Sequence, residues 1–97
     1  MLTPSHRVIP TSTIGAIQEL IVASDLMSKG FEVYRALSPA SKYDLLAIKE
    51  RVVYQIEVRI GHYYKNQVKY VIDKPIKPYY AVVTKEDNKI HYFPTLE

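Results

Sequence analysis

Two acids and a cation near the middle of the chain have the types and spacing of a site for phosphodiester hydrolysis. Asp44 lies near the start of one β-rich run, and Glu57 and Arg59 lie in the next, with a short polar turn around 49–51 between them. Two antiparallel strands joined by that turn would bring the carboxylates of Asp44 and Glu57 together, and a pair of nearby carboxylates suits a hard divalent cation. Glu57 and Arg59 share one strand face about 7 Å apart, so one could bind a metal while the other contacts a water or a phosphate.

A helix from about Thr13 to Ser28 is predicted to carry a third acid, Glu19. The hydroxyls of residues 11–13 are candidate N-caps, and Lys29 and Gly30 are typical of a helix end. Apolar residues recur at helical spacing and predict the face that packs on the rest of the fold: Ala16, Ile17, Leu20, Ala23 and Met27.

Glu19 lies beside that apolar stripe, which places its carboxylate toward the edge of a sheet. A partly buried carboxylate needs a cation or hydrogen-bond donors to offset its desolvation. A metal ion or Arg59 could supply that compensation. The alternative is an ordinary flanking glutamate that reaches water or pairs with Lys29 or Arg51.

The rest of the chain predicts strands. β-rich runs separated by turn residues occur at 31–36, 43–49, 52–60, 67–72, 79–84 and 89–94. Alternate residues of the third run form a continuous apolar face: Val52, Tyr54, Ile56, Val58 and Ile60. We therefore expect an α+β fold, resembling an α/β sandwich, in which the N-terminal helix packs on a mixed β-sheet.

Length and composition favour one small globular domain over residues 1–97. Hydrophobic residues make up 47% of the chain and charged residues 24%, which are globular values. There is no cysteine, which favours a reducing compartment and excludes thiol chemistry, so we expect a cytoplasmic protein. No run approaches the roughly 20 apolar residues of a membrane-spanning helix, so no membrane partner is expected.

A basic region follows the Glu57–Arg59 pair and could contact a polyanion. The net charge is only +3, but residues 62–77 contain four lysines and a single acid, Asp73. Aromatic residues interleaved with cations also suit stacking on unpaired bases. The candidate nucleic-acid contacts are His62, Tyr63, Tyr64, Lys65, Lys69, Lys74 and Lys77. The alternatives are a solvated lysine-rich edge and two tyrosines that cover the end of the sheet.

The order of these groups resembles the PD-(D/E)XK nuclease superfamily, the restriction-endonuclease-like fold. The helix acid Glu19, the strand acid Asp44 and the Glu-x-Arg of residues 57–59 follow the order of that superfamily. The segments 14–19, 29–33, 43–46 and 90–94 are similar to the compact branch that contains archaeal Holliday-junction resolvases and small group I intron endonucleases. The resemblance covers most of the chain.

The resemblance implies a DNA endonuclease that depends on Mg²⁺ or Mn²⁺. Asp44, Glu57 and the backbone carbonyl of Val58 would bind the ion, and Glu19 would complete the site or help to hold a second ion. Arg59 stands where the superfamily has lysine, and its guanidinium, which stays protonated, could orient water or clamp phosphate but could not act as a general base. A homodimer is expected, because two sites would cut two strands.

Two other functions are compatible with the sequence. In the first, the nuclease fold is kept but inactive, Arg59 pairs with Glu57 at the metal position, and the protein binds nucleic acid or a protein partner. In the second, the chain is an unrelated α+β interaction protein whose hairpins build a dimer sheet. The acids would then lie on a solvated strand face.

Overall fold

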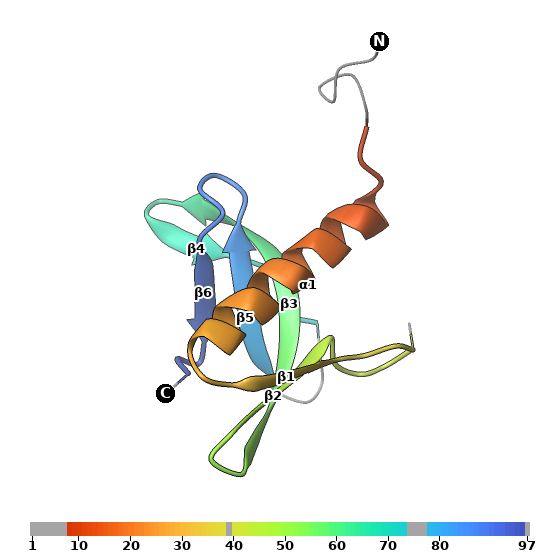
Figure 1. Ribbon diagram of the computed structural model, residues 1–97. Helices are drawn as coiled ribbons and strands as arrows, with labels where there is room; N and C mark the ends of the chain where they lie inside the picture. The colour runs from red at the N-terminus through yellow and green to blue at the C-terminus, as the bar shows by residue number, and fades with distance from the viewer. Residues whose placement is uncertain (1–7, 39, 74–77, 97) are drawn as a thin grey trace.

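The computed structural model describes residues 8–38, 40–73 and 78–96 as one helix packed on a six-stranded sheet (Figure 1). The predicted α+β architecture is therefore confirmed. The elements are α1 (Thr11–Ser28), β1 (Glu32–Arg35), β2 (Leu45–Lys49), β3 (Val52–Tyr64), β4 (Gln67–Lys69), β5 (Tyr79–Thr84) and β6 (Ile90–Phe93).

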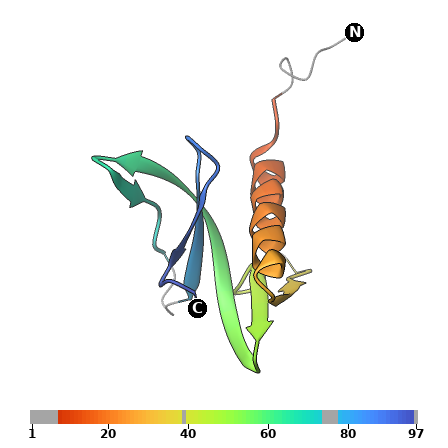
Figure 2. The same cartoon turned by 60° about the vertical axis from the view of Figure 1, so that its left-hand side comes forward.

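The sheet is mixed, as predicted, with the order β1-β2-β3-β5-β6. β3 and β5 are parallel, and the other neighbouring strands are antiparallel. β4 lies off this path and pairs with the last residues of β3. Figure 2 shows α1 as a separate layer beside the sheet and the β3–β4 hairpin curving away from it. The long strand β3 therefore connects the helix-covered part of the sheet to a projecting hairpin.

The helix begins earlier than predicted and without a side-chain cap. Pro10 occupies the N-cap position, and its carbonyl accepts bonds from the N–H groups of Thr13 and Ile14. The expected hydroxyl cap is therefore wrong. The predicted end at Ser28 is confirmed: Gly30, at a φ of 90°, allows the Phe31 N–H to bond back to the carbonyl of Leu26, which is the Schellman arrangement.

The buried face of α1 differs from the predicted stripe. Val22 and Leu26 are fully buried and form the core with residues of β2, β3 and β5. In contrast, Ile17, Leu20 and Met27 are each 44 to 57% exposed. Apolar residues occur on all sides of this helix, so their spacing does not single out one face.

The hairpin of β2 and β3 has the predicted tight turn. Lys49 pairs with Val52, and the two residues between them, Glu50 and Arg51, both have positive φ angles, 52° and 67°. These are the angles of a type I′ turn, whose twist matches that of the flanking strands. Leu45 pairs with Ile56 at the other end of the hairpin, which brings Asp44 beside Glu57.

The apolar face of β3 is shorter than predicted. Tyr54, Ile56 and Val58 belong to the core or pack against it, but Val52 and Ile60 are almost half exposed. The strand itself continues to Tyr64, beyond the predicted end at Ile60. At Gly61 it passes so close to β4 and β5 that an added Cβ would meet the Val82 side chain at 2.3 Å.

The strand predicted over 67–72 ends at Lys69. The next residue, Tyr70, turns its ring onto Phe93, at a centroid distance of 5.2 Å, and onto Tyr80, at 5.3 Å. Aromatic packing on the sheet therefore replaces continued pairing with β3.

Within the described ranges, α1 lacks the length of apolar sequence that a membrane crossing requires.

Candidate metal and nucleic-acid site

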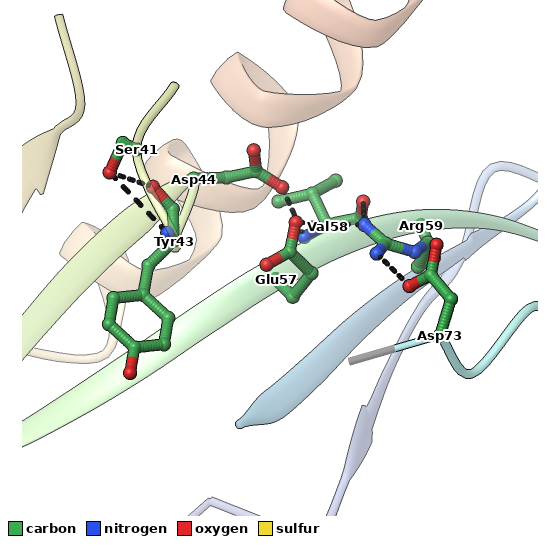
Figure 3. A network of polar contacts seen from close by, with 7 residues as sticks. All are labelled: Ser41, Tyr43, Asp44, Glu57, Val58, Arg59 and Asp73. Atoms are coloured by element: carbon green, nitrogen blue, oxygen red, sulfur yellow. Dashed lines mark hydrogen bonds and ion pairs between the residues drawn. The ribbon is translucent and has the colours of Figure 1, made fainter. Parts of the chain in front are cut away.

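Asp44 is held in place by three hydrogen bonds at the start of β2. Its N–H donates to the carbonyl of Ile56, and its carbonyl accepts from the N–H of Ala36. Its carboxylate oxygen Oδ2 accepts a bond of 2.8 Å from the N–H of Val58. The side chain is thus directed along β3 toward Glu57, as Figure 3 shows.

Glu57 is a buried acid, 4% exposed, on the central strand. Burial raises the pKa of its carboxyl, the Arg59 guanidinium opposes that effect, and the adjoining Asp44 carboxylate raises the pKa again, with a net increase. The effect of Asp44 on this pKa shows that the two carboxyl groups lie close together. The hairpin register therefore brings these two predicted site residues together, and the solvated strand face is wrong for Glu57.

Arg59 is the cationic partner of Glu57. Its Nη1 donates to Glu57 Oε1 at 2.9 Å and to the carbonyl of Val58 at 3.1 Å. Its Nη2 donates to Asp73 Oδ1 at 2.6 Å, drawn in Figure 3. The guanidinium also lies 5.7 Å from the centre of the Tyr80 ring, within the range of a cation–π contact. Burial lowers the pKa of Arg59, but the two carboxylates outweigh it and raise the pKa.

Glu19 reaches the same region from α1. Together with Asp44, Val58 and Arg59 it lines a pocket of about 390 Å³. Its carboxylate pairs with Arg35, 3.2 Å from Nε, and not with Lys29, Arg51 or Arg59 as the sequence suggested. A second pocket of about 290 Å³, lined by Arg35, Ser38 and Ser41, shares Glu19 and Asp44 with the first.

The oxygen atoms at this site have the chemistry that Mg²⁺ and Mn²⁺ prefer, since Asp44 and Glu57 are carboxylates and Val58 offers a carbonyl. Two of those atoms, Glu57 Oε1 and the Val58 oxygen, already accept bonds from Arg59. Across the described residues, no three or more His, Cys, Asp or Glu side chains are grouped to hold a metal. A metal would therefore compete with Arg59 for its ligands.

Two residues of the site were not singled out from the sequence. Asp73 stood out only as the single acid of the basic region, and Arg35 ends β1 with no motif around it. Both contacts join segments far apart along the chain, Arg59 with Asp73 and Glu19 with Arg35. The local sequence carries no signal for either contact, because tertiary packing brings the partners together.

The predicted nucleic-acid contacts lie mainly on the β3–β4 hairpin. His62 and Lys69 are exposed and pair across it, and Lys65 lies in its turn with Nζ over the Tyr64 ring at 5.4 Å. Lys74 and Lys77 lie outside the described residues.

Tyr63 contacts the β5–β6 turn. Its hydroxyl donates to Asp87 at 2.7 Å, its N–H donates to Glu86 at 3.1 Å, and its ring packs edge-on against His91. This position agrees with the alternative in which Tyr63 covers the end of the sheet.

The comparisons with known proteins bear on the fold. The bacterial homing endonuclease I-Ssp6803I superposes on the chain with a TM-score of 0.70 over 89% of the chain, at 18% sequence identity. The chain has the fold of a homing endonuclease. The match covers 66% of the length of that endonuclease, so the chain spans just under two thirds of it. No protein-family model matches the sequence, and the curated proteins give no match.

Proposed function

We propose that the protein is a divalent-metal-dependent DNA endonuclease of the PD-(D/E)XK type that hydrolyses phosphodiester bonds. The observation that supports it best is the bond from the Val58 N–H to Asp44, which sets Asp44 against Glu57. Asp44 also lines a pocket together with the helix acid Glu19, and the chain shares its fold with a bacterial homing endonuclease.

Asp44, Glu57 and the Val58 carbonyl would hold Mg²⁺ or Mn²⁺, with Glu19 completing the site. When bound, such an ion polarises the scissile phosphate, lowers the pKa of a bound water and offsets developing negative charge. A bound cation would offset the repulsion between the buried Glu57 and its neighbour Asp44, because two adjacent carboxylates repel each other. The ion must take the place of Arg59 Nη1 on Glu57 and Val58.

The two arginines of the pockets would contact the DNA backbone. Arg59 and Arg35 line adjoining pockets that share Glu19 and Asp44. A guanidinium matches the geometry of a phosphate group with two parallel N–H bonds. Arg59 and Arg35 are therefore the candidate phosphate contacts of these pockets. Lys65 and Lys69 would add phosphate contacts from the projecting hairpin.

A homodimer would supply two sites for the two strands of a duplex. The outer face of α1 offers a surface for the second copy, because Ile17, Leu20 and Met27 form an exposed apolar stripe there. Replacing Leu20 by glutamate should convert a dimer to monomers in analytical ultracentrifugation.

The cysteine-free composition supports a cytoplasmic location for this enzyme.

A second function is favoured by the position of Arg59. Its bonds to Glu57 and Val58 suit a catalytically inactive nuclease-fold module, which binds nucleic acid or a protein partner and in which the guanidinium replaces the metal. Removing Arg59 from such a module would uncover the metal ligands.

Calorimetric titration of Mn²⁺ separates the two functions. An endonuclease should bind Mn²⁺ as the parent chain, and Asp44→Asn should abolish that binding. If the protein is an inactive module, the parent should not bind Mn²⁺ and the Arg59→Ala variant should bind it. Lack of binding by both proteins would contradict the proposed metal site. Cleavage of supercoiled plasmid in Mn²⁺, with Asp44→Asn as the control, then tests the activity.

A further inference from the structure

Asp73 contacts Arg59 from a segment that the sequence did not connect with the site. It follows β4 and the ring of Tyr70, which packs on the sheet. Its side chain is 58% exposed, whereas that of Arg59 is 18% exposed. The Asp73 carboxylate thus reaches from the surface to a largely buried guanidinium, at a distance of 2.6 Å.

The guanidinium divides its donors between two sides. Nη1 donates to two oxygens of the proposed metal site, Glu57 Oε1 and the Val58 carbonyl. Nη2 donates to Asp73. Figure 3 shows Asp73 at the Arg59 end of this network, away from Asp44. Because Nη1 and Nη2 have separate partners, the bond at Nη2 can hold Arg59 in place without the bonds at Nη1.

We propose that Asp73 is a positioning residue for Arg59. It would hold the guanidinium beside the pocket when a metal binds the Glu57 carboxylate and the Val58 carbonyl. This role rests on the proposed function. A cation on those oxygens repels the guanidinium, and Asp73 gives Arg59 a carboxylate that the metal does not use. Without Asp73, Glu57 is the one carboxylate in contact with Arg59 among the described residues, so Arg59 and the metal compete fully for it.

NMR spectra of the Arg59 guanidinium test the positioning directly. Asp73→Asn keeps the shape of the side chain and removes its charge, and its exposed position makes unfolding of this variant unexpected. In the parent, the Nη2 protons should give slowly exchanging signals that Arg59→Lys abolishes and that persist after addition of Mg²⁺. Asp73→Asn should make them exchange faster, because a neutral amide oxygen is a weaker acceptor for a guanidinium than a carboxylate. Identical Arg59 signals in the parent and Asp73→Asn would overturn the proposal.

Mn²⁺ affinity provides the second measurement. Asp73→Asn should lower the affinity about fivefold, the change expected for loss of a partly exposed ion pair that keeps Arg59 from competing with the metal. In an Arg59→Met background, the same substitution should change the affinity less than about twofold, because Asp73 then has no guanidinium to hold. An equal loss in both backgrounds would overturn the proposal, since Asp73 would act on the metal directly.

These measurements separate failure of the inference from failure of the proposed function. If neither the parent nor Arg59→Met binds Mn²⁺, the metal site is wrong, and the spectra without metal still decide whether Asp73 positions Arg59. Glu50→Gln is a matched control, since it removes one negative charge from the exposed β2–β3 turn. It should change neither the Arg59 signals nor the affinity.

Discussion

The carboxylate of Asp44 and the N–H of Val58 form a hydrogen bond of 2.8 Å that ties the first residue before β2 to the central strand. The carbonyl of the same residue, Val58, accepts a hydrogen bond from Arg59. Asp44 therefore joins its own carboxylate to the residue whose carbonyl would be a second metal ligand. Its backbone bonds to Ala36 and Ile56 make this position independent of the side-chain charge.

Replacing Asp44 by asparagine should abolish metal-dependent cleavage and preserve the fold. The amide oxygen can still accept the bond from Val58, but the charge that attracts Mg²⁺ is lost. Substitution of groups that merely support metal ligands costs 10-fold to 100-fold, so loss of a ligand charge should reduce the cleavage rate by at least about 100-fold. Plasmid cleavage measures the rate and circular dichroism the fold. Unchanged cleavage would exclude Asp44 as a metal ligand.

Local patterns predicted the elements and the pairing of Asp44 with Glu57. The helix end is local, because Gly30 supplies the positive φ that the turn needs. The hairpin is also local, since a two-residue turn sets the register that places Asp44 beside Glu57. These parts of the fold depend on neighbours in the sequence, which is why the sequence predicts them.

The contacts of Arg59 and Glu19 could not be predicted in the same way. Asp73 reaches Arg59 only because the chain leaves β4 after Lys69 and packs Tyr70 on the sheet. Glu19 meets Arg35 because α1 crosses the sheet with the face of Val22 and Leu26 inward. A helix with apolar residues on all sides does not reveal that face, so its partners depend on tertiary packing.

Gly61→Ala should lower the free energy of unfolding by about 1–3 kcal/mol, because overpacking forces the strands apart. An added Cβ would meet Val82 at 2.3 Å and the backbone oxygen of Lys69 at 3.0 Å. The matched control is Gly15→Ala, where a Cβ meets nothing within 4 Å. That helical substitution should raise stability by about 0.5–1 kcal/mol. Urea unfolding measures both, and equal stabilities would contradict the close approach at Gly61.

Asp87 should make stability depend on pH in strongly acidic solution. Its hydrogen bonds from Thr84 and Tyr63 lower the pKa of the carboxyl from 3.8 to about 2. A depressed pKa in the folded state means that the stabilisation is complete above pH 3.8 and disappears as the pH falls through about 2. Urea unfolding should show a constant difference between the parent and Asp87→Asn at higher pH, shrinking toward pH 2. A difference that persists unchanged into that acid range would contradict this assignment.

Binding to DNA should weaken steeply as salt rises, because lysines that contact phosphates release condensed counterions. Each contact adds about −0.9 to the slope of log affinity against log salt, so replacing Lys65 and Lys69 by alanine should flatten the slope by about 2. Lys29→Ala is the control, since Lys29 already pairs with Asp25 at 3.0 Å. Fluorescence anisotropy at several salt concentrations gives the slopes. If the affinity of the parent for DNA does not change with salt concentration, the protein-interaction alternative is favoured.

Arg59→Lys should retain or raise cleavage if Arg59 acts in the position of the superfamily lysine. A compact ammonium can still orient water or contact phosphate, and its weaker hold on the Glu57 and Val58 oxygens leaves them more available to the metal. Arg59→Ala should lose most of the activity, because no cation then remains at the phosphate. Single-turnover cleavage in Mn²⁺ measures both variants, and calorimetry shows whether each still binds the ion. Equal activity of Arg59→Ala and the parent would remove Arg59 from the catalytic machinery and leave it a structural partner of Glu57.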